Sequence, residues 1–103
     1  MSSRNYILNS HGIPVVQPDV MEWARWFECC EKRVVKQEKV GDTFVSTVFL
    51  GLDHNWSGVG GPVLWETMCF EGKMAGEMDR CSGSREQAEA MHGRMVKRVK
   101  EGK

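Results

Sequence analysis

Apolar residues recur at helical spacing near the start of the chain. Within residues 19–31 they form one stripe made of Val20, Trp23, Ala24 and Phe27, which Trp26 and Cys30 widen. Asp19 stands before the stripe, and Glu22 comes three positions after Asp19, which is the spacing of a capping box at a helix start. Spacing and cap together predict a helix over residues 19–31.

A second apolar stripe at helical spacing lies near the end of the chain, over residues 84–100. Its members are Ala88, Met91, Met95 and Val99. Ser84 and Gln87 again match a capping box at the start of the segment. Gly93 lies inside the segment and costs about 1 kcal/mol relative to alanine, but the stripe continues beyond it. This pattern predicts a second helix.

Between the two helical segments the pattern changes to runs that are typical of β-strands. The runs are residues 33–40, 43–50, 62–71 and 73–80. Gly41-Asp42 joins the first two, and glycine at the first turn position suits a tight type II′ hairpin. Glu71-Gly72 is a second candidate for a two-residue turn. The runs therefore predict an antiparallel β-meander of four strands.

Residues 4–16 contain a shorter strand-like piece that turns between Asn9 and Gly12 and runs into Pro14. Pro14 cannot donate to a strand ladder, so we expect an edge strand or arm here. The order of elements predicts one α+β domain over residues 1–103. Its architecture is two-layered: a four-stranded antiparallel meander, with a short N-terminal strand, packed against two helices.

A two-residue turn at Glu71-Gly72 would fix the register of the hairpin that contains it. Trp65 would then face Met78, and Glu66 would face Glu77. Like charges directly across a ladder are unfavourable unless water screens them or a cation lies nearby. Either the two carboxylates extend into solvent, or Glu66, Glu77 and Asp79 form an acidic surface that accepts a cation or a basic partner.

Composition narrows the classes of partner. The chain has 14 Lys and Arg and 14 Asp and Glu, so no net charge attracts it to nucleic acid or to an anionic membrane. No apolar run approaches the roughly 20 residues that span a bilayer, and the first residues lack the order of a signal peptide. We therefore expect a cytoplasmic protein. Its 4 cysteines show no C-x-x-C spacing, which predicts buried free thiols.

The segment 51–61, Gly-Leu-Asp-His-Asn-Trp-Ser-Gly-Val-Gly-Gly, is too long for a minimal hairpin. An indole offers a stacking surface, neighbouring polar groups offer donors and acceptors, and glycines let backbone N–H groups approach an anion. These groups suit a nucleotide or another phosphate-bearing small molecule, with Arg80 or Arg25 as charge partner. The predicted site consists of Asp53, His54, Asn55, Trp56, Gly58, Gly60, Gly61 and Arg80. The alternative is a purely structural loop.

The sequence contains no recognisable motif for nucleotide hydrolysis, dinucleotide binding or nucleophilic catalysis. No lysine follows the glycines as in a phosphate-binding P-loop, and a strand rather than a helix comes next, so the segment is not a dinucleotide fingerprint. His54 beside Asp53 could serve as a general base in a small hydrolase, but adjacent side chains rarely aim at each other. The sequence predicts no catalytic residue, no metal site and no cofactor.

Several phrases together resemble a family of small proteins of tailed phages, prophages and some bacteria. The phrases are YIL, MEWARWFE, VSTVFLGLDHN, a Gly-Pro before LWETMCF, GEMDR and EQAEAMH, which cover Tyr6 to His92. The chain departs from the family at 84–87, where Ser-Arg-Glu-Gln replaces a Thr-Trp-Glu-Glu type of helix start, and in having cysteines. The resemblance implies a phage origin and brings no settled activity with it.

Small phage proteins without enzymatic motifs are often counter-defence factors. The sequence therefore favours a non-enzymatic binding protein that sequesters a nucleotide-type ligand, with a homo-oligomer as one form it could take. The alternative is an inhibitor of a host defence protein that binds through Glu66, Glu77 and Asp79. A His54-dependent hydrolase is the third hypothesis.

Overall fold

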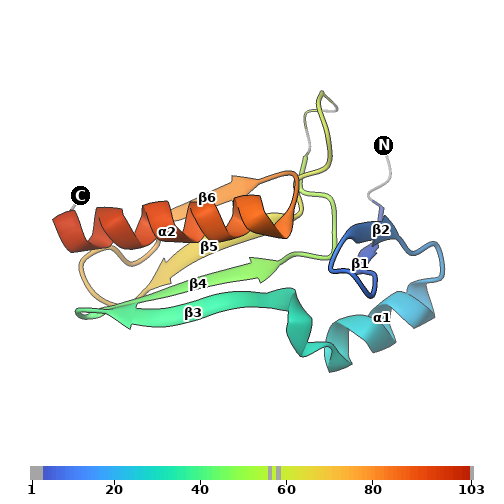
Figure 1. The fold of residues 1–103 in the computed structure, drawn as a ribbon, viewed down its shortest axis with the longest axis horizontal. Coiled ribbons are helices and arrows are strands. Elements are labelled where there is room, and N and C mark those ends of the chain that lie inside the picture. Colours follow the sequence, from blue (N-terminus) through green and yellow to red (C-terminus); the bar gives the residue numbers. More distant parts are fainter. Residues whose placement is uncertain (1–3, 56, 58, 103) are drawn as a thin grey trace.

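A four-stranded antiparallel sheet with one long helix across one face forms the main body of the protein (Figure 1). The structure is a computed structural model that describes residues 4–55, 57 and 59–102. The strands run in the order β3-β4-β5-β6. Their bounds are β3 Val34–Val40, β4 Thr43–Phe49, β5 Trp65–Phe70 and β6 Met78–Cys81. The predicted α+β meander is confirmed.

The turn between β3 and β4 has the predicted two-residue form. Val40 pairs directly with Thr43, which leaves Gly41 and Asp42 as the loop. Gly41 has φ 62°, whereas Asp42 is outside the left-handed region. A type II′ turn requires this combination, and glycine adopts the positive φ without steric cost.

Helix α2, Arg85–Glu101, lies across the sheet and supplies most of its cover. The predicted capping box is present: the Ser84 hydroxyl accepts from the Gln87 N–H, and the Gln87 side chain accepts from the Ser84 N–H. The helix buries Ala88, Met91, His92 and Met95. Three of these belong to the predicted apolar stripe, and His92 is the addition.

Strand alternation decides which residues meet α2. Along β4 and β5 every second side chain is buried against the helix, while the residues between them face the open side of the sheet. The set on the α2 side is Thr43, Val45, Thr47 and Phe49 from β4, and Trp65, Thr67 and Cys69 from β5. Ser46 is buried as well, on the other side, where its hydroxyl accepts from Gln37 Nε2 at 2.9 Å. Phe49, Trp65 and Met91 belong to one core cluster, and Val45, Cys69 and Met95 to a second.

An N-terminal lobe lies at one end of the sheet (Figure 1). It contains β1 (Tyr6–Leu8), β2 (Pro14–Val16), α1 (Val20–Cys29) and the short 3-10 helix η1 (Glu31–Arg33). Sequence patterning predicts one short N-terminal strand, whereas β1 and β2 pair as a separate two-stranded hairpin. Helix α1 has the predicted Asp19 cap but is shorter than 19–31. The predicted capping box is incomplete, because the Asp19 N–H donates to Gln17 Oε1 rather than to Glu22.

The tryptophans of α1 join the lobe to the sheet. The Trp23 indole N–H donates to the carbonyls of Tyr6 and Gly51, at 3.1 and 3.0 Å. Trp26 packs edge-on against Phe49 at the end of β4. Both indoles therefore attach α1 to neighbouring elements.

The predicted register of the β5–β6 hairpin is wrong. Trp65 pairs with Cys81 and Glu66 with Arg80, because residues 71–77 form a longer connection than a two-residue turn. Met74 folds back from this connection into the core beside Cys69, and the Gly76 N–H donates to the Cys69 carbonyl at 2.9 Å. Burying the Met74 side chain favours the longer turn.

A matched pair of glycine substitutions tests this packing. Gly51 has φ 75°, and an added Cβ would lie 2.8 Å from the Phe27 ring. Gly51→Ala should lower the free energy of unfolding by about 2 kcal/mol, since it combines left-handed strain with a clash. Gly93 lies in the middle of α2 with nothing within 4 Å of an added Cβ. Gly93→Ala should raise stability by about 1 kcal/mol.

Urea unfolding of the two variants measures both effects. A Gly51→Ala variant as stable as the parent protein would contradict the close packing of α1 against the end of β4.

Candidate functional site

The loop that follows β4 is held together by the polar side chains expected to bind a ligand. Asp53 Oδ1 accepts from the backbone N–H groups of Asn55, at 2.8 Å, and Val63, at 3.0 Å. Because Val63 lies ten positions along the chain from Asp53, these bonds close the loop at its base. Asp53 therefore satisfies backbone donors of its own chain.

Asn55 plays the same part nearer the tip of the loop. Its Nδ2 donates to the carbonyls of Val59, at 2.7 Å, and Gly61, at 2.8 Å, and its Oδ1 accepts from the Ser57 N–H, at 3.1 Å. An amide has two donor hydrogens, and both are used here. Binding a ligand through this amide would require the loop to open.

His54 is tied to the loop as well. Its backbone N–H donates to the Val63 carbonyl at 2.9 Å, and its Nδ1 lies 2.8 Å from the Leu52 carbonyl. A carbonyl only accepts, so Nδ1 carries the ring hydrogen and the lone pair of the neutral ring lies on Nε2. Of the other predicted groups, Trp56 and Gly58 lie outside the described residues. Gly60, with φ 84°, and Gly61 are both exposed.

The predicted charge partners are engaged elsewhere. Arg80 Nε donates to Glu66 Oε2 at 2.8 Å across the β5–β6 ladder, and Arg25 pairs with Glu22 at 2.9 Å along α1. In the described part of the chain, neither guanidinium makes an ion pair with Asp53. The structure does not bring these arginines together with the loop carboxylate.

The predicted acidic surface is divided. Glu66 faces Arg80 rather than Glu77, so the like-charge pair inferred from the sequence is wrong. Glu77 pairs with Arg98 of α2 at 3.2 Å. Asp79 is aligned with Thr67, whose side of the sheet is the one that α2 covers, whereas Glu66 lies on the opposite side. The role of these residues in partner binding stays a prediction.

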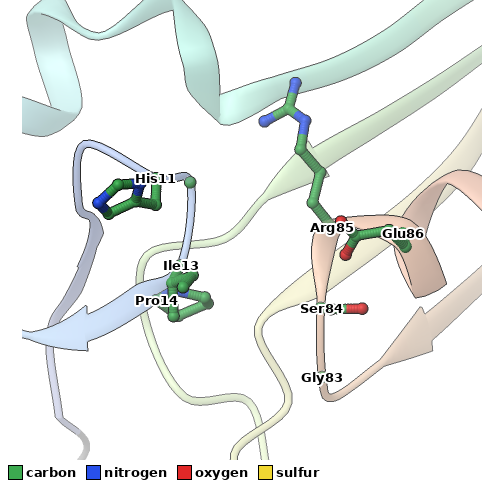
Figure 2. A pocket seen from close by; sticks show the side chains of 8 residues that line it. His11, Ile13, Pro14, Gly83, Ser84, Arg85 and Glu86 are labelled. Atoms are coloured by element: carbon green, nitrogen blue, oxygen red, sulfur yellow. The ribbon is translucent and has the colours of Figure 1, made fainter.

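A groove beside the loop is formed by segments far apart in the sequence (Figure 2). One cavity, of about 240 Å³, lies between the turn of the β1–β2 hairpin and the start of α2. Its lining residues are His11, Gly12, Ile13, Pro14, Gly83, Ser84, Arg85 and Glu86. A second cavity, of about 350 Å³, shares Pro14 and Gly83 with the first, so the two adjoin, and together we call them the groove.

The second half of the groove is reached by the end of the β4–β5 loop. Gly61, Pro62 and Leu64 line it opposite Tyr6 of β1. Apolar side chains thus dominate this half, while His11, Ser84 and Glu86 supply polar groups in the first half. Among the sequence-predicted site residues, Gly61 is one that the structure places on this groove.

Two contacts fix the α2 side of the groove. The Trp65 indole N–H donates to the Gly83 carbonyl at 2.8 Å, immediately before the Ser84 cap. The Arg85 guanidinium extends toward the segment that joins η1 to β3 (Figure 2) and donates to the Lys32 carbonyl at 2.8 Å. The groove wall is therefore preformed, as is usual for ligand sites.

A buried chain of polar side chains crosses the core, and sequence reasoning missed it. Thr67 Oγ1 lies 2.5 Å from Thr47 Oγ1, which lies 2.7 Å from His92 Nδ1. His92 Nε2 lies 3.4 Å from Glu38 Oε1. The His92 side chain is 2% exposed. The available signal was alternation: Thr47, Thr67 and His92 all occupy positions that face inward in the predicted strands and helix.

The environment of these groups shapes their titration. Desolvation lowers the pKa of His92 below its ordinary value, and the neighbouring Glu38 carboxylate offsets part of this effect. Burial likewise raises the pKa values of the Cys69 and Cys81 thiols. All 4 cysteines are free, as expected, but the expectation of burial is wrong for Cys29, which is exposed.

The described residues contain no group of three or more His, Cys, Asp or Glu side chains placed to hold a metal ion. None of the helices in this described part has the length and apolarity needed to cross a bilayer. Comparison with protein-family models, with curated proteins and with solved structures finds no match to this chain.

Substitution of Asp53 tests the structural role of the loop carboxylate. Asp53→Ala removes the acceptor of two backbone N–H groups and should lower the free energy of unfolding by about 1–2 kcal/mol. Asp53→Asn keeps Oδ1 and should cost less. The direct readout is hydrogen exchange at the Val63 amide, which should accelerate in the alanine variant. Unchanged exchange and stability in Asp53→Ala would show that this carboxylate is not needed to hold the loop.

Proposed function

We propose that the protein is a non-catalytic binding protein, of the phage counter-defence kind, that sequesters a nucleotide-type ligand in the groove between the β1–β2 hairpin and the start of α2. The observation that carries the proposal is the groove itself. Its walls come from Tyr6 and residues 11–14, from Gly61, Pro62 and Leu64, and from residues 82–86, and its two halves measure about 240 and 350 Å³. The larger of the two, at about 350 Å³, lies within the volume range of small-molecule sites.

The distribution of groups along the groove supports a nucleoside-containing ligand. Tyr6, Pro14, Pro62 and Leu64 offer flat or apolar surfaces in one half, which suit the faces of a base. The other half has the imidazole of His11, the hydroxyl of Ser84 and the carboxylate of Glu86, a mixture of donors and acceptors that suits a base edge or a sugar.

Charge limits how many phosphates the ligand carries. Arg85 is the arginine that lines the groove, and its guanidinium is committed to the carbonyls of Lys32 and Val34. The backbone N–H groups at the start of α2 favour one anionic group through the helix dipole. Glu86 opposes a higher negative charge there. We expect a ligand with one phosphate per nucleoside rather than a triphosphate.

The site proposed here differs from the one inferred from the sequence. Loop segment 51–61 contributes Gly61 to the groove, but Asp53 and Asn55 hydrogen-bond within the loop. Under this proposal the loop shapes one wall, and its polar side chains keep that wall in place rather than contact the ligand.

Thermal unfolding in the presence of nucleoside monophosphates and cyclic dinucleotides tests the proposal. At least one of them should raise the melting temperature of the parent protein, because a ligand that binds only the folded state stabilises it. Ile13→Glu should abolish that rise. Ile13 is 56% exposed and lines the groove, so the new carboxylate would enter the site without disturbing the core.

Val59→Glu is the matched control. Val59 is 79% exposed and lies at the tip of the loop, so the same change in charge should leave the rise intact. The Trp56→Ala variant distinguishes ligand binding in the groove from ligand binding at the loop. If Trp56→Ala abolished the rise while Ile13→Glu retained it, the ligand would bind at the loop and the groove assignment would be wrong. No rise with any nucleotide would contradict the ligand class.

A further inference from the structure

The buried polar chain joins four elements of the fold. Thr67 comes from β5, Thr47 from β4, His92 from α2 and Glu38 from the edge strand β3. The chain therefore connects the helix to three strands at the centre of the layer between them. The apolar contacts of α2 surround it on the same helix face, through Ala88, Met91 and Met95.

The chemistry of the end groups fixes the direction of every hydrogen bond in the chain. A carboxylate only accepts, so the contact with Glu38 places the ring hydrogen on Nε2 of His92. Nδ1 then carries a lone pair, and Thr47 must donate to it. Thr47 Oγ1 in turn accepts from the Thr67 hydroxyl. Each buried hydroxyl has one defined role, and the neutral imidazole is part of that arrangement.

A second proton on His92 is incompatible with this direction. Nδ1–H would become a donor, and the Thr47 hydroxyl hydrogen already points at it. Thr47 would have to turn toward Thr67, and Thr67 would then need a new acceptor. Within the described residues Thr67 Oγ1 has no side-chain partner other than Thr47. The reversed chain therefore leaves a buried donor unsatisfied, which is costly in an interior.

The charged groups that face His92 come from β3. Glu38 favours the imidazolium form, and Lys36, whose Nζ lies 3.7 Å from Glu38 Oε2, opposes it. From β4 and β5 the imidazole meets the uncharged hydroxyl chain of Thr47 and Thr67. On α2 itself the residues three or four positions away are Ala88, Glu89, Met95 and Val96. Glu89 is the charged one, and its carboxylate lies 3.9 Å from the Arg85 guanidinium.

We propose that the hydrogen-bonded series Thr67–Thr47–His92–Glu38 helps to hold α2 on the sheet and fails at acidic pH. We call this series the latch. Above the ordinary range of histidine titration the directed chain is complete and the helix is locked. When His92 takes its second proton, the chain must reverse and α2 loosens from β4 and β5. Because the first turn of α2 forms one wall of the groove, acidification also loosens that wall.

The direction of the pH effect follows from linkage. Burial lowers the pKa of His92 in the folded protein below the unfolded value of about 6.5. The stabilisation by the neutral ring is therefore fully present above about pH 6.5. It is lost as the pH falls below that value, until His92 is protonated in the folded state as well.

Hydrogen exchange of the apo protein between pH 7.5 and 5, corrected for intrinsic rates, measures the latch without any ligand. Amide protection in the middle of α2 should fall by up to about tenfold per pH unit, the limit for coupling to one proton. His92→Asn places an acceptor at the position of Nδ1 but cannot be protonated. It should lack this acid-dependent loss.

Two substitutions on the edge strand give opposite predictions and leave the core intact. Glu38→Gln keeps an acceptor for Nε2–H but removes the charge that favours imidazolium, so the His92 titration followed by NMR should shift to lower pH. Lys36→Gln removes the opposing cation and should shift it to higher pH. The midpoint for loss of α2 protection should move with the titration in both variants.

Three results would overturn the proposal. The acid response of α2 could persist unchanged in folded His92→Asn. The Glu38 and Lys36 variants could shift the titration in the same direction or not at all. Finally, the loss of α2 protection could fail to follow the His92 titration in those variants, a test that remains available even if His92→Asn does not fold.

Discussion

The packing of α2 across the inward face of the meander is the interaction on which the other features depend. It buries Phe49, Trp65, Met91 and Met95, the largest apolar side chains of the interior. At roughly 1.5–3 kcal/mol for each large side chain buried, this contact is a major favourable contribution to folding. The packing of α2 also fixes the position of residues 82–84, which precede the helix and line the groove.

The position of the groove follows from how the N-terminal lobe is attached to that layer. Trp23 binds two carbonyls, one in β1 and one at Gly51, while Trp26 packs on Phe49. From the other side, Arg85 binds the carbonyls of Lys32 and Val34. These contacts hold the β1–β2 hairpin opposite the start of α2, so the loop residues that line both walls are joined to anchored elements.

Burying His92 within the same layer introduces a constraint that an apolar residue would not. Its two ring nitrogens need partners of opposite kinds, and the fold supplies a hydroxyl on one side and a carboxylate on the other. A buried network is favourable only when every member is satisfied. The same hydrogen bonds of His92 that fix the position of α2 on the sheet would therefore make this packing sensitive to pH under the proposal above.

Local sequence patterns were sufficient for much of the fold. The Ser84–Gln87 cap, the Gly41–Asp42 turn and the apolar stripe of α2 are properties of neighbouring residues, and all three are found. The register of β5–β6 was not predictable in this way, because it depends on Met74 reaching a core formed by other elements.

The site depended even more on long-range contacts. Asp53 and Asn55 have the composition of a ligand site, but their partners, Val63 and Gly61, become apparent only in three dimensions. The groove joins Ile13 and Pro62 to Ser84, three segments that no local pattern relates. The roles of Thr47 and Thr67 could not be predicted for another reason. Threonine is common in strands, so a threonine at an inward position does not by itself indicate a buried hydrogen bond.

The most direct measurement of the central claim is an amide chemical-shift map of the labelled protein with the nucleotide that binds it best. Binding in the groove predicts perturbations that cluster in residues 11–14, 61–64 and 82–86. Perturbations confined to residues 53–60, or to the open side of the sheet around Phe70 and Met78, would contradict it.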